Sequence, residues 1–135
     1  MGYGKAAQAY RENAVMGASP VQLVVMLYDG ALRFMEEGKR AIESRDLETQ
    51  NSKLQRAQKI VIELMTTLNF QQGGDIARSL VSLYAYVIGE LVEGNMADDA
   101  KRIDNAMKTM KELRDSWVQV EKAPKGVQEL TPNAA

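Results

Sequence analysis

The sequence of 135 residues contains neither cysteine nor histidine. The lack of cysteine excludes disulfides and thiolate metal sites. The lack of histidine excludes Ser-His-Asp and Cys-His nucleophiles, histidine phosphotransfer and Glu-x-x-His di-metal sites. Carboxylate or lysine catalysis stays open in principle, but nearly every Asp and Glu falls on a polar face or a helix cap. We therefore predict a protein that is not an enzyme and that needs no cofactor or metal.

An excess of one charge and long hydrophobic runs are also missing. Seventeen Lys and Arg against eighteen Asp and Glu leave a net charge of −1, whereas a nucleic-acid binder needs a basic surface. The longest apolar stretch, 21–35, is interrupted by Gln22, Asp29 and Arg33, so it falls short of the roughly 18 apolar residues of a transmembrane helix. The first residues lack the apolar core of a secretory signal. We predict no nucleic-acid binding, no stable membrane insertion and a cytoplasmic location.

Proline is scarce, and its placement organises the chain. The only three are Pro20, Pro124 and Pro132, so 21–123 is free of the residue that is most costly inside a helix. Apolar residues in this interval recur with helical period. The sequence predicts four helices. The first is expected to run from 20 to about 44, with Ser19 and Gln22 as a capping box, and the second from 47 to 68 or 69, after Asp46. The third is expected to run from 76 to 94 or 95, after a turn at 71–74 and Asp75, and the fourth from 99 to about 121, after Asp98.

Short connections between long helices favour antiparallel neighbours. We therefore predict an all-α fold, an antiparallel up-down four-helix bundle over 19–121. Residues 1–18 form a separate N-terminal arm, whose alanines and Tyr10 suit a short helix that docks on the bundle or on a partner. Residues 122–135 carry two prolines and few large apolar side chains, which is typical of a flexible tail.

The predicted helices carry more apolar surface than a small core requires. A bundle helix buries an arc of somewhat over 100°, yet two stripes on the third helix together span roughly 200°. The stripe predicted to face the core contains Ile76, Leu80, Leu83, Tyr84, Val87 and Leu91, and the second contains Val81, Ala85, Ile88 and Val92. The first half of the first helix, with Val25, is broader still, and Ile60 and Ile62 flank the core stripe of the second.

This surplus has two interpretations. Exposed rows of Val, Leu and Ile favour a partner surface, because burying each is worth about 1.5–3 kcal/mol. Alternatively, central helices of a small bundle can be broadly apolar, and a homodimer would cover the same stripes. The second case describes a structural homodimeric bundle acting as a protein-interaction adaptor.

Three ordered segments carry a family likeness. They are Ala9-Tyr10-Arg11 with Ala14 to Pro20, then Leu23 to Ala31, then Gly73-Gly74-Asp75-Ile76-Ala77 with Leu80 and Leu83-Tyr84, and Trp117 near the end agrees. The pattern resembles the flagellin-specific export chaperones, the FliS family, over about residues 6–120. One departure is Ala85, where the family often has an acidic residue.

The resemblance implies an antiparallel four-helix bundle that binds the C-terminal segment of flagellin, which is helical when bound. It also implies delivery of that cargo to the cytoplasmic domain of the flagellar export gate, within the bacterial cytosol. Tyr10 matches an N-terminal tyrosine that the family uses in partner contacts. Together with the surplus stripes, this gives the expected partner-binding residues, which are Tyr10, Val25, Ile62, Val81, Ala85, Ile88 and Val92.

Overall fold

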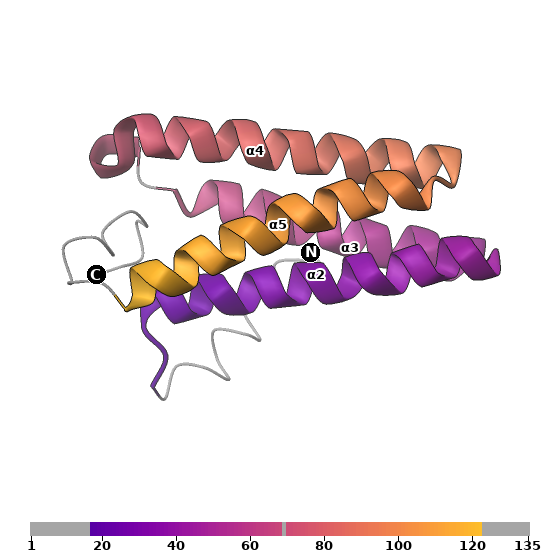
Figure 1. Cartoon of the computed structure of the whole chain (residues 1–135), viewed down its shortest axis with the longest axis horizontal. Coiled ribbons are helices and arrows are strands. Elements are labelled where there is room, and N and C mark those ends of the chain that lie inside the picture. Colours follow the sequence, from indigo (N-terminus) through magenta and orange to yellow (C-terminus); the bar gives the residue numbers. More distant parts are fainter. Residues whose placement is uncertain (1–16, 69, 123–135) are drawn as a thin grey trace.

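A computed structural model describes residues 17–68 and 70–122, and these residues form a four-helix bundle (Figure 1). The helices are α2 (Pro20–Ser44), α3 (Leu47–Thr66), α4 (Phe70–Ala97) and α5 (Ala100–Glu121). The predicted antiparallel, all-α architecture is confirmed. None of the helices in these ranges is both long and apolar enough to cross a membrane.

The four helices are arranged as a ring in chain order. Helix α2 packs against α3 and α5, and α4 packs against the same two helices on the other side. In Figure 1, α4 and α2 accordingly lie at opposite edges of the bundle, with α3 and α5 between them. Helix α4 therefore has two lateral borders, one with α3 and one with α5, and an outer face.

Local side-chain chemistry sets where the helices begin. The Gln22 N–H donates to Ser19 Oγ at 3.1 Å and the Ser19 N–H donates to Gln22 Oε1 at 2.7 Å, so the predicted capping box is present before α2. Asp46 caps α3 by accepting from the Thr49 N–H at 3.1 Å, and hydrogen bonding to the side chain and then to the backbone of Thr49 lowers the pKa of the carboxyl. Helix α5 begins one residue later than predicted, because Asp99 is its cap.

Helix α4 differs from the prediction at both ends. Its first residue is Phe70, so the expected turn at 71–74 is reduced to a break at Gly74, where φ is 50° and ψ is −121°. Its last residue is Ala97, although Gly94 or Asn95 was expected to end it. Gly94 is instead needed for close packing, since a Cβ there would lie 2.7 Å from Ile103 Cδ1 of α5.

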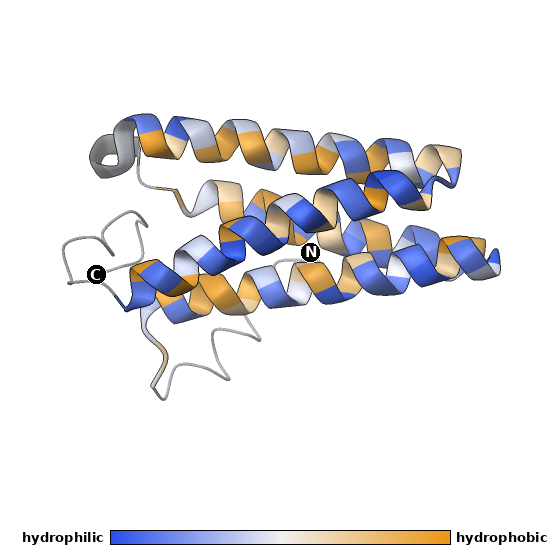
Figure 2. Cartoon of the chain, viewed as in Figure 1, coloured by the Kyte–Doolittle hydropathy of each residue, from blue (hydrophilic) through white to orange (hydrophobic). Residues whose placement is uncertain are grey.

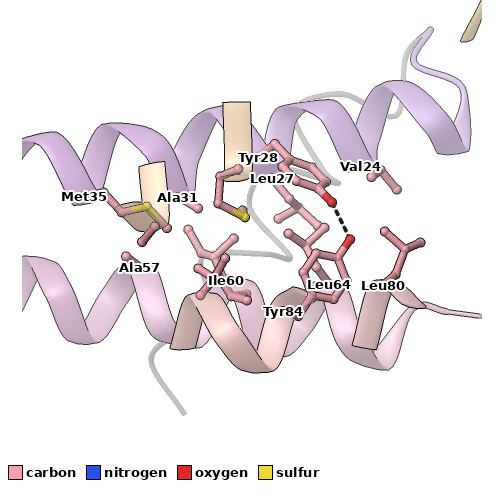
Figure 3. Packing of buried hydrophobic residues seen from close by; sticks show 14 of the residues in the cluster. Val24, Leu27, Tyr28, Ala31, Met35, Ala57, Ile60, Leu64, Leu80 and Tyr84 are labelled. Atoms are coloured by element: carbon pink, nitrogen blue, oxygen red, sulfur yellow. Dashed lines mark hydrogen bonds between the residues drawn. The ribbon is translucent and has the colours of Figure 1, made fainter. Parts of the chain in front are cut away.

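Buried apolar side chains from all four helices fill the interior (Figure 3). At one point α2 and α3 approach so closely that only glycine fits. A Cβ at Gly38 would lie 2.4 Å from Cδ2 of Leu54, which is fully buried. The hydrophobic stripes of the helices are directed inward, while the visible face of α5 is mainly hydrophilic (Figure 2).

A polar cluster inside the core joins α2, α4 and α5. The hydroxyls of Tyr28 and Tyr84 share a hydrogen bond, drawn in Figure 3, and Trp117 Nε1 donates to the Tyr28 hydroxyl at 3.1 Å. Burial raises the pKa of Tyr84 to about 12, and it raises the pKa of Tyr28 further above its ordinary value. These bonds tie together α2 and α4, the two helices that lie diagonally across the ring.

Candidate partner-binding surface

The apolar surplus predicted on α2 is largely consumed by the core. Most of the apolar residues in the first half of α2 are buried, and Val25 is only 9% exposed. Helix α2 can bury so wide an arc because it packs against α3 and α5 more extensively than α4 does. On α3, Ile60 is also buried, which corrects its assignment to a flank of the core stripe. Val25 therefore offers little surface to a partner.

Helix α4 is where apolar side chains remain exposed. Ile76 and Leu83 were predicted to face the core, but both are exposed, and Leu83 keeps 39% of its accessible surface. The buried residues of α4 are Gly73, Ala77, Leu80, Tyr84, Val87, Leu91 and Gly94. On the helical wheel Gly94 lies on the same side of α4 as Ile76 and Leu83, and this side faces α5. Ile76 and Leu83 therefore lie at the α5 edge of the buried face, where Gly94 is covered and they are not.

Polar contacts identify which border of α4 each stripe faces. On one side, Gln50 Nε2 of α3 donates to the Asn95 carbonyl at 3.0 Å, and Asn95 Nδ2 donates to Asn51 Oδ1 at 3.0 Å. On the other side, Arg102 of α5 pairs with Glu90 at 2.9 Å. The α3 border of α4 is therefore the side that bears Asn95, and the α5 border is the side that bears Glu90.

The predicted second stripe of α4 lies on the α3 border. At 100° per residue, Val81, Ile88 and Val92 fall on the same side of α4 as Asn95, with Ala85 further out. Val81 and Ile88 are half-buried against the core, whereas Ala85 and Val92 are exposed, Val92 by 37%.

Ile62 of α3 reaches the same border. It follows Asn51 by three helical turns and shares its face, and it is 39% exposed. The antiparallel register set by the Asn51–Asn95 bond places Ile62 level with the turns of α4 that carry Val81, Ala85 and Ile88. We call the surface of Ile62, Val81, Ala85, Ile88 and Val92 the α3–α4 strip. Five of the seven expected binding residues thus lie together.

The two remaining candidates do not lie with this strip. Val25 is in the core on α2. Tyr10 lies outside the described residues, as do nearly all of the predicted N-terminal arm and C-terminal tail. Sequence reasoning also missed two exposed side chains of α4, Tyr86 and Met96, of which Met96 is 81% exposed.

The opposite side of the bundle is charged rather than apolar. A hollow of about 310 Å³ between α2 and α5 is lined by both acids and lysines. Lys39 Nζ and Asp104 Oδ1 are 2.9 Å apart there, and this partner raises the pKa of Lys39. No group of three or more His, Cys, Asp or Glu residues within 17–68 and 70–122 is arranged to hold a metal ion. The surface feature that distinguishes this molecule is the set of exposed apolar side chains on its helices.

A small helical bundle whose distinctive surface is exposed apolar helix belongs to the class of proteins that bind other protein chains. The family model described as "Flagellar protein FliS" matches residues 3–124. A solved bacterial flagellar chaperone superposes with a TM-score of 0.72, covering 87% of this chain and 96% of its own, at 20% identity.

Curated relatives agree with the family model. The flagellar secretion chaperone FliS of Bacillus subtilis is 35% identical over 111 residues, which cover 82% of each chain. The FliS of Campylobacter jejuni is 36% identical over 112 residues, or 83% of this chain and 88% of that one. The chain therefore belongs to the FliS family of flagellar secretion chaperones, and this role is not enzymatic.

Proposed function

We propose that this protein binds the C-terminal segment of flagellin in the bacterial cytosol, prevents its premature polymerisation and delivers it to the cytoplasmic domain of the flagellar export gate. Family membership supports a flagellar cargo. The observation that carries the binding surface is the α3–α4 strip, where Ile62 and Val92 remain 39% and 37% exposed in the single chain. Tyr10 is a further proposed contact, outside the described residues.

The strip accounts for one part of a larger interface. Complete burial of a Val or Ile side chain is worth about 1.5–3 kcal/mol, so covering the remaining third of Ile62 or Val92 contributes about 0.5–1 kcal/mol each. A flexible segment also loses conformational entropy when it becomes helical on binding. Useful affinity therefore requires the cargo to extend over further exposed side chains of α4. An amphipathic helix is the natural occupant, because it presents one apolar face along its length.

The arm at 1–18 has a place in this proposal. We propose that residues 1–18, of which 1–16 lie outside the described residues, cover part of the strip in the free protein and are displaced by cargo. Removal of residues 1–9, which keeps the proposed contact Tyr10, should then strengthen the binding of a flagellin peptide when it is measured by isothermal titration.

The main test is a titration of the full chain with a peptide of the flagellin C-terminal segment. The double variant Ile62→Asp plus Val92→Asp places two charges on the strip at exposed positions, so the bundle should stay folded by circular dichroism. We expect its affinity to fall at least about tenfold, because each carboxylate would be desolvated without a counter-charge. Leu83→Asp is the matched control, since Leu83 is as exposed as Ile62 but borders α5.

Two results would contradict the proposal. If the double variant binds the peptide as tightly as the wild-type chain and Leu83→Asp does not, the binding site lies at the α5 border of α4 instead. A wild-type chain that sediments as a dimer, becomes a monomer in the double variant and never binds the peptide would favour the homodimeric adaptor.

A further inference from the structure

Three positive side chains surround the ring of Phe34 on the border between α2 and α3. The guanidinium carbons of Arg33 and Arg56 lie 5.3 and 5.8 Å from the ring centroid. Lys53 Nζ lies 5.5 Å from it. Each such contact stabilises an exposed cation by about 0.5–1 kcal/mol, but three like charges around one ring also repel one another. The border therefore carries a local excess of positive charge.

Only part of this charge is balanced within the bundle. Glu37 Oε1 lies 3.9 Å from Arg33 Nε, and Glu37 Oε2 lies 3.3 Å from Lys53 Nζ. Arg56 has no acidic partner in the part of the chain that the structure describes, and neither has Lys59, three residues further along α3. These two cations are therefore available to carboxylates of another molecule.

Arg56 and Lys59 also line a hollow on the outer face of α3. Its volume is about 510 Å³. Two amides, a hydroxyl, one carboxylate and one apolar side chain complete its lining, and they belong to Asn51, Gln55, Ser52, Glu48 and Leu47. Amides and hydroxyls can hydrogen-bond the backbone of another chain. Leu47 is 63% exposed, so the same hollow also offers an apolar contact.

The hollow between α2 and α5 has a different charge balance. Lys108 and Lys111 line it at the same three-residue interval as Arg56 and Lys59. Four carboxylates line it as well, and they belong to Glu36, Asp104, Glu112 and Asp115. An acidic partner would be repelled by these carboxylates. Attraction of such a partner is therefore expected at α3 and not between α2 and α5.

The hollow on α3 fits a protein segment better than a membrane or a nucleic acid. Lipid headgroups and phosphates present negative charge at regular intervals, and part of it would meet Glu37 or Glu48, which flank the cations. A peptide can instead place carboxylates at Arg56 and Lys59 and neutral residues beside the two glutamates. An apolar residue of the same peptide can cover Leu47, which neither a headgroup nor a phosphate does.

We propose that the hollow on α3, together with the cations around Phe34, binds an acidic segment of a second partner protein. This segment carries carboxylates for Arg56 and Lys59 and an apolar side chain for Leu47. The hollow shares no residue with the α3–α4 strip, and Arg56 lies about 120° around α3 from Ile62. The inference therefore goes beyond the proposed function and does not depend on it.

The test uses the full chain and a labelled synthetic peptide of glutamate, alanine and leucine. Binding is followed by fluorescence anisotropy at physiological ionic strength, where charges on other faces of the bundle are largely screened. The double variant Arg56→Glu plus Lys59→Glu should bind the peptide at least about tenfold more weakly, because two attractive charges become repulsive. A peptide with glutamine in place of glutamate should not bind the wild-type chain.

The matched control is Lys108→Glu plus Lys111→Glu. It makes the same change of charge at the same spacing, on exposed positions of α5, and should leave the affinity for the acidic peptide unchanged. Circular dichroism checks that both double variants are folded. If the charge reversal on α3 unfolds the chain, Arg56→Gln plus Lys59→Gln decides the question, because it removes the two charges and adds none.

Four results would overturn the inference. The first is a wild-type chain that does not bind the acidic peptide, and the second is an equal loss of affinity in the two double variants. The third is binding of phosphatidylglycerol vesicles, but not of the peptide, with the same dependence on Arg56 and Lys59, which would assign the surface to a membrane. The fourth is a joint loss of acidic-peptide and flagellin-peptide binding in the folded α3 variant, which would make the hollow part of the cargo site. A wild-type chain that binds the acidic peptide but no flagellin peptide would contradict the proposed function alone.

Discussion

The buried pair of Tyr28 and Tyr84 makes the folding free energy of the bundle fall as the pH rises above about 10. The folded chain holds the Tyr84 proton more tightly than the unfolded chain does, because burial raises the pKa from 10.0 to about 12. A raised pKa in the folded state contributes stability that is complete below the unfolded value. That contribution is lost as the pH rises from 10 to about 12.

The size of the loss follows from the two pKa values. Each pH unit between them corresponds to about 1.36 kcal/mol, so ionisation of Tyr84 should remove about 2–3 kcal/mol of folding free energy by about pH 12. Tyr28 should contribute a comparable loss in the same window, because burial and the neighbouring Tyr84 raise its folded pKa further and only the unfolded chain ionises it there. A loss of this size is a large part of the 5–15 kcal/mol typical of a domain.

The assay compares the wild-type chain with Tyr84→Phe. Urea unfolding can be followed by the fluorescence of Trp117, the only tryptophan, from about pH 9 to about pH 12. At the lower pH the variant should be less stable by about 1 kcal/mol, because it lacks one hydrogen bond. Towards the upper end the wild-type chain should become the less stable of the two. Parallel curves over the whole range would refute the reasoning.

Two further predictions concern packing within the bundle. Gly38→Ala should lower the free energy of unfolding by about 1–2 kcal/mol net, because overpacking against the buried Leu54 exceeds the gain in helix propensity. In the double variant Gly38→Ala plus Leu54→Ala, the loss of stability should be smaller than the sum of the two single losses when urea midpoints are compared. Gln50→Leu should cost about 1–3 kcal/mol in the same measurement, because Gln50 Nε2 donates to Asn95 and to Asp98 Oδ1 from a buried position; a loss below about 0.5 kcal/mol would contradict this role.

The helices themselves were predictable because their signals are local. The capping box at Ser19, the cap at Asp46 and the helical period of the apolar residues each depend on neighbours within one or two turns. The antiparallel ring followed from the short connections. These features needed no knowledge of which helix packs against which.

The errors arose where small residues decide the packing. A helical wheel weights Ile76 and Leu83 heavily and gives Ala77 and Gly94 almost no weight, yet the latter two are buried. Gly94 lies five turns from Ile76 on the same side of α4, so close packing against Ile103 of α5, and not hydropathy, decides which of the two positions is covered. The sequence also does not show whether a glycine ends a helix or admits a neighbouring helix, so the end of α4 was predicted at Gly94 or Asn95.

The candidate site was predictable in part for the same reason. Four stripe residues of α4 and Ile62 lie together because helical spacing places them at the α3 border. The width of the apolar arc on α2 did not indicate a site, since α2 packs more extensively against α3 and α5 than α4 does and so buries more of its surface. Broad apolar arcs therefore distinguish a binding helix only when its packing partners are known.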